Sequence, residues 1–372
     1  EAMMVDRNTP TGISQTGLGK VPGRNRVTMQ DVARAAGCSQ STVSFVLSGN
    51  TRAHISEATR HRVMQAVREL GFIYKTPDAA RSPQGSGPGG GAIGGTIALI
   101  IDKITTSPEG IVMLDGVREI ARSMNAIVLV AETDNDPLIE PATAEMFIEQ
   151  GVRAIIYACI FTRDVSIPNA LRETALPVVL LNCYDPAEAL PAVVPGETAG
   201  GHRATNALIE AGHRRIGTIT GEGFMEAARD RLQGYRNALA TADIPFAPEL
   251  VVEGDWSPSA GYRGTRALMA LDNPPSAIFC QNDRMAIGCY EALKEMGKRI
   301  PEDISVIGYD DSETALHMSP PLTSLILPSR AMGRWAMEQI TGGGDAAGAA
   351  MRPVKLECEL VERNSIAPPS GL

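Results

Sequence analysis

Apolar positions follow two different patterns along the chain. From Val27 to Leu70 they recur three or four residues apart, which is the period of an α-helix. From Thr96 onward, short apolar runs rich in β-branched residues alternate with longer stretches of helical period. Such runs predict parallel strands whose connecting helices cover both faces of a sheet. We therefore expect a small all-α domain followed by an α/β core.

The stretch from Val27 to Gly49 predicts two short helices joined by a glycine turn. Ala33 is a small residue where two helices can touch, Gly37 is free to adopt a positive φ, and Val43 is an apolar residue that faces back. This spacing is typical of a helix-turn-helix. The spacing alone would also fit an ordinary helical hairpin whose outer face is solvated, and this is the alternative.

The second of these helices offers a surface for reading DNA. Ser39 is its expected N-cap, and Gln40, Ser41, Ser44 and Phe45 fall together on its outer face. Uncharged hydrogen-bonding groups beside an aromatic ring suit the base edges of a major groove. We therefore predict that this helix contacts bases.

A third helix is predicted to follow Ser56, its expected N-cap, and to end at Gly71. The apolar stripe of this helix consists of Ile55, Val63, Ala66, Val67 and Leu70. Three helices with a shared apolar centre make a small domain.

The remainder of the chain contains two series of strands with helices between them. The predicted strands are residues 96–101, 126–131, 154–160, 177–181, 215–220, 250–254, 276–280 and 304–309. Two series of similar length predict two lobes, with a ligand crevice at the carboxyl ends of the strands.

Charge is distributed unevenly. The whole chain of 372 residues carries −9, yet residues 1–93 hold 11 Lys or Arg against 6 Asp or Glu, a net +5, which leaves −14 for the rest. The basic part is the part with the helix-turn-helix pattern, so DNA binding is expected to weaken steeply with salt. The candidates for phosphate contacts are Arg24, Arg26, Arg34, Arg52, Arg60 and Arg62.

Several other classes of protein are disfavoured. Neither a membrane-spanning apolar run nor a secretory signal is present in the sequence, so a cytoplasmic location is expected. The six cysteines form no Cys-x-x-Cys pair and the five histidines show no metal spacing, so we expect free thiols and neither a metal nor a cofactor. A Gly-x-Ser-x-Gly elbow and a phosphate-binding loop are also missing, which argues against an enzyme.

Specific motifs carry a family resemblance. The sequence DVARAAGCSQSTVSFVLSG at residues 31–49, within a head of about residues 27–82, resembles the DNA-binding head of the LacI family of bacterial transcription regulators. The phrases AGHRRIGTITG (211–221), DRLQGYRNAL (230–239), QNDRMAIG (281–288) and PEDISVIGYDD (301–311) are similar to its two-lobed, type I periplasmic-binding-protein-like core. The resemblance extends to about residue 366.

This resemblance implies a domain plan. It comprises a disordered tail (1–26), the helix-turn-helix DNA-binding domain (27–75), a hinge and Gly/Pro-rich linker (76–95), the effector-binding and dimerisation core (96–366) and a short tail (367–372). Within the core, lobe 1 would hold about 96–194 and 326–345, and lobe 2 about 195–325 and 346–366. A last strand at 354–363 would return to lobe 2.

The resemblance also implies an effector site. Arg231 matches the family's ligand-clamping arginine, whose fork can hold two oxygens. Asn282 and Asp310 match positions that hydrogen-bond sugar hydroxyls, Trp256 matches an aromatic that lies against a sugar ring, and Arg229 is a weaker candidate. Taken singly, Arg231 could be a surface ion pair, Asp310 a strand-end cap and Trp256 a core residue.

The implied function is that of a sequence-specific transcriptional regulator, with repression expected. A homodimer would read pseudo-palindromic double-stranded operator DNA under control of a small-molecule effector, for which a carbohydrate is expected. The predicted DNA-contacting residues are Thr28, Ser39, Gln40, Ser41, Thr42, Ser44, Phe45 and Arg81. A periplasmic-type solute-binding protein without a regulatory role is the alternative.

Two positions in the DNA-binding part of the chain depart from the family pattern. Pro83 stands where the hinge helix usually ends in a leucine that wedges into the minor groove, so weaker operator kinking is expected. Phe45 stands where most relatives carry an arginine suited to guanine. Because phenylalanine packs on a thymine methyl instead, we expect an altered half-site at that base.

Overall fold

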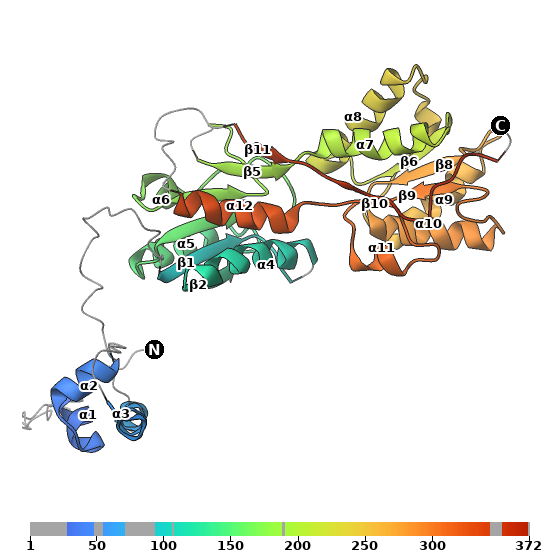
Figure 1. Ribbon diagram of the computed structural model, residues 1–372. Helices are drawn as coiled ribbons and strands as arrows, with labels where there is room; N and C mark the ends of the chain where they lie inside the picture. The colour runs from blue at the N-terminus through green and yellow to red at the C-terminus, as the bar shows by residue number, and fades with distance from the viewer. Residues whose placement is uncertain are drawn as a thin grey trace, which may run out of the picture. The chain divides into compact units, whose positions relative to one another are not determined.

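The computed structural model describes residues 28–47, 55–70, 94–105, 108–187, 190–342 and 352–370. It divides into two units, a helical head up to Gly89 and a core from Gly90 onward, and each is described by itself (Figure 1). The all-α head and the α/β core confirm the fold class expected from the apolar pattern.

The head consists of α1 (Met29–Ala36), α2 (Gln40–Leu47) and α3 (Glu57–Leu70). The Thr28 side chain caps α1 and Asp31 bonds back to the Thr28 main chain, which makes a capping box. Gly37 ends α1 with a φ of 61°, a left-handed conformation that glycine adopts readily and most other residues resist. The buried centre consists of Val32, Ala33, Ala36, Val43, Val46, Val63 and Ala66.

The first lobe of the core is built on a six-stranded parallel sheet. In spatial order its strands are β11 (Val354–Leu356), β5 (Ala192–Pro195), β4 (Val178–Leu181), β3 (Ala154–Ala158), β1 (Gly95–Ile101) and β2 (Ala126–Glu132). The register aligns Ile97 of β1 with Val128 of β2 and with Ala154 of β3. Helices α4 (Pro108–Ser123) and α12 (Ser329–Thr341) cover one face, and α5 (Ile139–Glu149) and α6 (Asn169–Glu173) cover the other.

The second lobe repeats this plan on a four-stranded parallel sheet. Its strand order is β7 (Val251–Glu253), β6 (Ile216–Thr220), β8 (Ala277–Cys280) and β9 (Ser305–Ile307). One face is covered by α7 (Glu197–Glu210) and α8 (Glu226–Thr241), and the other by α9 (Pro258–Met269) and α10 (Asp283–Glu295). A 3-10 helix η2 (Pro248–Leu250), a short helix α11 (Glu313–His317), and the antiparallel pair β10 (Ser324–Leu325) and β12 (Leu360–Val361) complete it.

The chain passes between the lobes three times in its described part: at Gly196, between Leu325 and Ser329, and between Leu356 and Leu360. The last passage corrects the predicted strand at 354–363, which was assigned wholly to lobe 2. Residues 354–356 instead join the first lobe as β11, because they pair with β5 and Leu356 O accepts from Gly196 N at 2.7 Å.

The strand orders place a candidate ligand crevice. In both lobes the chain order reverses beside the first strand, between β1 and β3 and between β6 and β8. Ligands of open α/β sheets bind outside the carboxyl ends of strands at such switch points.

Among the described residues, no helix is long and apolar enough to span a membrane.

Candidate functional site

The outer face of α2 is positioned by a cap at Ser39, the residue just before the helix begins. Ser39 Oγ accepts a hydrogen bond from Thr42 N at 3.1 Å and lies 2.8 Å from Thr42 Oγ1, so both hydroxyls serve the helix start. Gln40 and Ser41 are exposed, while Ser44 is half-buried. The exposed polar groups are therefore free to meet a nucleic acid. The Phe45 side chain, Arg81 and Pro83 lie outside the described residues.

The basic residues of the head divide into two kinds. Arg62 Nε donates to Ala36 O at 3.3 Å, which ties α3 to α1, and Arg34 lies 3.5 Å from Asp31. The Arg60 side chain makes no hydrogen bond or ion pair to another described residue, so its charge is available for phosphate. Arg24, Arg26 and Arg52 lie outside the described residues.

In the core, the guanidinium of Arg231 is enclosed by protein. Its Nε and Nη2 donate to Glu197 Oε2 and Oε1 at 2.7 and 2.8 Å, and its Nη1 donates to Gln281 O. The Tyr309 ring lies against it, 3.6 Å from Cζ to the ring centre. Burial lowers the pKa of Arg231, but Glu197, Tyr309 and Asp310 together raise it by more, so the side chain stays cationic. Both Arg231 and Glu197 are only 3% exposed.

This pairing changes the role expected of Arg231. The two oxygens held by its fork belong to Glu197, and the pair is buried rather than on the surface. The Asp310 carboxylate approaches Nη1 only to 3.7 Å, too far for a hydrogen bond. Arg231 therefore holds the loops around it, and at most its Nη1 edge can face a ligand.

Trp256 occupies a backbone conformation that is rare for a bulky residue, with a φ of 62°. Its ring packs on Gly221, where a Cβ would lie 1.8 Å from ring atom Cζ2, so only glycine fits there. The indole Nε1 lies 3.0 Å from the Met225 sulfur, and Arg231 Cζ is 5.6 Å from the ring centre. The residue is half-buried, so part of its surface remains exposed.

Asn282 and Asp310 follow the carboxyl ends of β8 and β9. Asn282 Oδ1 accepts from Met285 N at 2.8 Å and thereby caps α10, while its Nδ2 donates to Trp256 O at 3.2 Å. Asp310 has a φ of 101°, and burial raises the pKa of its carboxyl well above the usual range although Arg231 opposes this. Arg231, Trp256, Asn282 and Asp310 are thus brought together in one cluster.

Arg229 does not join that cluster in the same way. It is exposed and its Nη1 donates to the main-chain oxygen of Phe224. Next to the cluster, burial raises the pKa of Asp283 to about 6, an effect reduced by hydrogen bonds from Ser324 Oγ and Ser312 N.

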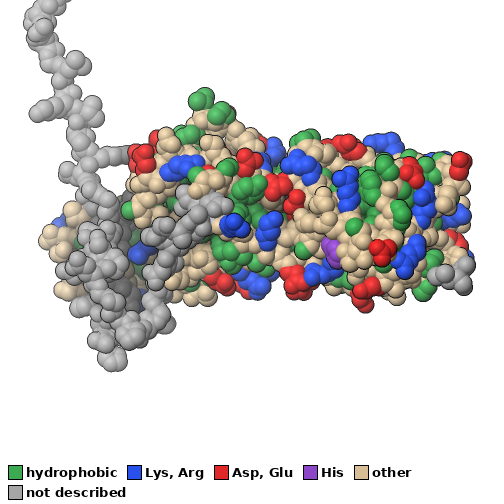
Figure 2. All heavy atoms as spheres, turned by 90° about the horizontal axis from the view of Figure 1, so that it is seen from above, with side chains coloured by type: hydrophobic (Ala, Val, Ile, Leu, Met, Phe, Trp, Pro, Cys, Tyr) green, Lys and Arg blue, Asp and Glu red, His purple; other side chains and the backbone are tan. Residues whose placement is uncertain are grey.

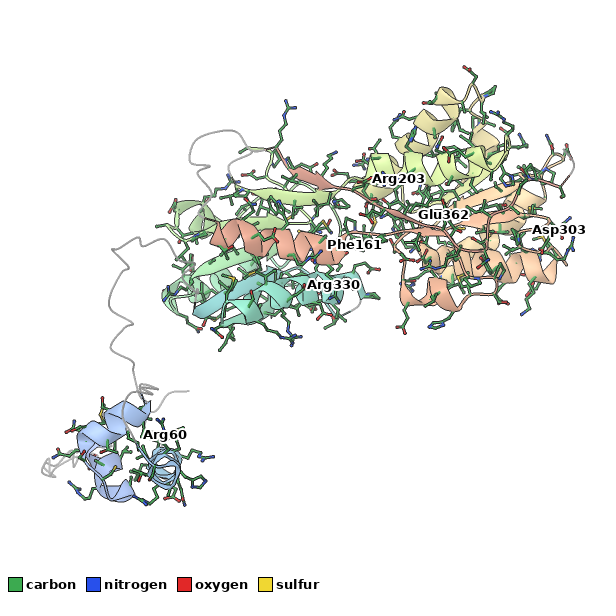
Figure 3. The ribbon with its side chains drawn as sticks, in the orientation of Figure 1. Arg60, Phe161, Arg203, Asp303, Arg330 and Glu362 are labelled. Atoms are coloured by element: carbon green, nitrogen blue, oxygen red, sulfur yellow. The ribbon has the colours of Figure 1, made fainter. Side chains whose placement is uncertain are left out.

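None of the predicted effector-site residues lies in the first lobe. Phe161 follows β3, is 46% exposed, and in Figure 3 lies at the end of the first lobe nearest the second. Tyr184 follows β4, and its hydroxyl donates across the lobes to Glu226 Oε2 at 2.9 Å. Both come shortly after the ends of predicted strands, so the carboxyl-end rule could have indicated them.

Comparisons with known proteins agree with this geometry. Residues 28–74 match the family described as bacterial regulatory proteins, lacI family, and residues 205–366 match the periplasmic binding protein-like domain. The ribose operon repressor of Haemophilus influenzae is 33% identical over 343 residues, covering 91% of this chain and 98% of the relative. The transcriptional regulator CelR of Thermobifida fusca is also 33% identical, covering 92% of this chain and 99% of the relative.

Solved structures show the same architecture. A complex of the regulator CelR with cellobiose superposes with a TM-score of 0.61 at 30% identity, covering 91% of this chain and all (100%) of that one. The Lac repressor bound to ONPG in its repressed state superposes with a TM-score of 0.68 at 25% identity, covering 92% and 100%. The alternative of a solute-binding protein without a regulatory role is therefore wrong. With a DNA-reading head, a two-lobed core and full-length repressor relatives, the chain belongs to the LacI family of bacterial transcription regulators.

Proposed function

We propose that this regulator is a repressor released from, or held on, its operator by an uncharged carbohydrate bound in the crevice. The observation that carries the proposal is the buried Glu197–Arg231 pair at the base of the cluster. Because the positive charge of Arg231 is matched by Glu197, a phosphate or carboxylate ligand would find no spare cation in this cluster. A neutral ligand rich in hydroxyls needs no cation, so the pairing of Arg231 with Glu197 does not weaken its binding.

The remaining groups suit a sugar. The open part of the Trp256 ring can lie against the apolar face of a pyranose or furanose. The Asp310 carboxyl makes no side-chain hydrogen bond at normal distance to another described residue, so it can accept from ligand hydroxyls. Two relatives support this class, since one is named a ribose operon repressor and one is solved with cellobiose.

Control of DNA binding follows from the crevice lying between lobes. A sugar that contacts Trp256 on one lobe and Phe161 on the other binds some lobe angles better than others. The sugar can shift the equilibrium between lobe angles only by as much as its affinities for those angles differ. In this scheme the protein binds small molecules and DNA without chemical turnover, and it works in the cytoplasm, where operator DNA lies.

A thermal-shift screen of the full chain with neutral sugars and sugar phosphates tests the crevice proposal. Neutral sugars are expected to raise the melting temperature, since a ligand of the folded state stabilises it by mass action. Trp256→Ala should remove the shift of any hit while operator binding is retained, and Lys298→Ala, an exposed lysine elsewhere on the second lobe, should not. Sugar phosphates that stabilise the chain more than their parent sugars do, and lose this effect in Trp256→Ala, would contradict the proposal.

We also propose that the core forms a homodimer through β2. This strand is the edge of the six-stranded sheet, and it exposes Ile127 at 66% and Leu129 at 36%. An exposed apolar edge strand is a site where another chain packs, and a second copy supplies a self-complementary partner. Two-fold symmetry would also give two heads for a pseudo-palindromic operator.

Sedimentation velocity tests the dimer. Ile127→Lys should shift the protein from dimer to monomer and weaken operator binding, because one head reads only half a site. Leu316→Lys alters an apolar side chain exposed at 55% on α11 and should leave the dimer intact. A monomeric wild-type chain at micromolar concentration would exclude the proposal.

A further inference from the structure

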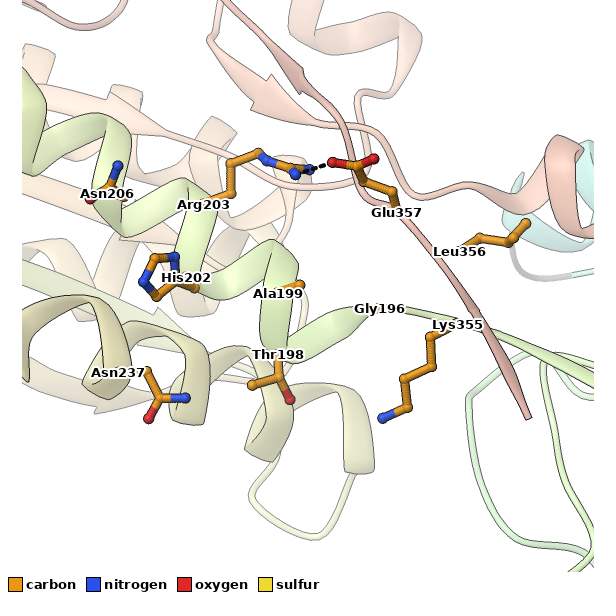
Figure 4. Close-up of a pocket in the computed structure, with 10 residues that line it drawn as sticks. All are labelled: Gly196, Thr198, Ala199, His202, Arg203, Asn206, Asn237, Lys355, Leu356 and Glu357. Atoms are coloured by element: carbon orange, nitrogen blue, oxygen red, sulfur yellow. Dashed lines mark hydrogen bonds and ion pairs between the residues drawn. The ribbon is translucent and has the colours of Figure 1, made fainter. Parts of the chain in front are cut away.

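A hollow lies beside the segments that connect the lobes, and none of the residues that line it belongs to the crevice cluster. It has a volume of about 730 Å³, and its walls come from α7, α8 and β11. Figure 4 shows Lys355 reaching from β11 toward the side where Thr198 of α7 and Asn237 of α8 lie. Its walls therefore belong to both lobes, since β11 is part of the first-lobe sheet while α7 and α8 cover the second.

One rim of this pocket is already neutralised. Arg203 forms an ion pair with Glu357 and also donates to Cys358 O, which ties α7 to the third connecting segment. Asn206 Nδ2 donates to Glu210 Oε1 at 2.7 Å and is likewise engaged. These contacts fix the shape of the rim without providing a free charge.

The opposite side of the pocket carries polar groups that no other described residue engages. Lys355 and the His202 ring make no hydrogen bond or ion pair to another described residue, and neither does the Thr198 hydroxyl. Asn237 uses its Oδ1 to accept from Gln233 Nε2 at 2.8 Å, so its Nδ2 remains free to donate. Three elements thus present an ammonium, an imidazole, a hydroxyl and an amide N–H to one hollow.

We propose that this pocket, termed here the connector pocket (Thr198, His202, Asn237 and Lys355 with the Arg203–Glu357 rim), binds a small phosphorylated metabolite. Its lining carries one positive charge from Lys355 beyond the neutral Arg203–Glu357 pair, and its free groups are predominantly hydrogen-bond donors. Donors around a net positive charge match the oxygens of a phosphate monoester. The volume exceeds that of a bare phosphate and lies within the range of small-ligand sites.

The site is distinct from the crevice in both chemistry and place. In the crevice the buried cation is matched by Glu197, whereas Lys355 in the connector pocket is exposed and unmatched by any described residue. A ligand that bridges β11 to α7 and α8 contacts both lobes, so its affinity depends on the angle between them.

Isothermal titration of the full chain with 3-phosphoglycerate, inorganic phosphate and glycerol tests the proposal. Saturable binding of 3-phosphoglycerate is expected, with weaker binding of phosphate and none of glycerol. Lys355→Ala should weaken binding about tenfold, the loss of one charge-assisted hydrogen bond. Asn237→Asp, which puts a negative charge in the pocket, should also weaken it.

Matched variants make the outcome decisive. Lys298→Ala removes another exposed lysine and should bind as the wild type does, and Trp256→Ala should leave this affinity unchanged because that ring belongs to the crevice. Lack of saturable binding in the millimolar range, or equal affinity in Lys355→Ala, would overturn the proposal. Loss of binding in Trp256→Ala would place the anion in the crevice instead.

Discussion

At the scale of single residues, the Glu197–Arg231 pair combines two buried charges with three hydrogen bonds and a stacked tyrosine. Removing water from two ions is costly, and their mutual attraction offsets this only when the geometry is good. The pair therefore contributes little net stability as a unit, yet each member depends strongly on the other.

Arg231→Ala is accordingly expected to destabilise the core by about 3–5 kcal/mol, because it leaves Glu197 charged and unpaired in the interior. The double variant Arg231→Leu with Glu197→Leu should recover most of that loss. Urea unfolding followed by circular dichroism measures both. The comparison variant is Arg299→Ala, whose partner Asp303 lies 3.1 Å away on the surface. If Arg231→Ala and Arg299→Ala lower the free energy of unfolding equally, Glu197 does not depend on Arg231 as expected.

At the scale of elements, local signals in the sequence determined the head well. Ser39 and Gly37 act within a few residues, and each occupies the cap or turn predicted for it. Leu70 was predicted to belong to the buried apolar stripe of the third helix. It is 36% exposed, whereas Val63 and Ala66 of the same stripe are buried. Short-range capping and helical period are thus readable from a single chain.

Long-range pairing was harder to predict. Strand β11 has only three residues, 354–356, and its partner β5 lies about 160 positions earlier in the chain. The sequence pattern had not predicted β5 either. The same holds for the site: Arg231 was identified by its motif, but Glu197 lies 34 residues away and has no pattern of its own. Nothing in the sequence indicated that the arginine would already be paired.

The glycine turn of the head gives a test at this scale. Gly37→Val should weaken the head by about 1–2 kcal/mol, because a β-branched residue resists the left-handed conformation. Gly37→Asn should be nearly neutral, since asparagine tolerates that conformation and a Cβ at Gly37 meets no atom within 4 Å. Operator binding of the full chain, measured by fluorescence anisotropy near physiological temperature, reports the difference. If both variants bind alike, the turn does not need its positive φ.

At the scale of the whole molecule, charge separates the two tasks of the chain. Acidic and basic side chains are interspersed on the face of the core seen in Figure 2, and the sequence from residue 94 onward is net acidic. An acidic core repels the DNA backbone, so contact is directed to the basic head. Repulsion between the acidic core and the DNA backbone thus helps to orient the protein with its head on the DNA.

This separation predicts a measurable salt dependence of operator binding. The logarithm of the association constant should fall linearly with the logarithm of salt concentration, by about 0.9 for each phosphate contacted. Because Arg60 has no partner among the described residues, Arg60→Gln should reduce that slope by about 0.9 for each head, while the preferred operator sequence stays the same. Arg299→Gln on the acidic core provides the matched control and should not alter the slope. An unchanged slope in Arg60→Gln would show that its charge faces solvent, and would leave phosphate contact to Arg24, Arg26 and Arg52.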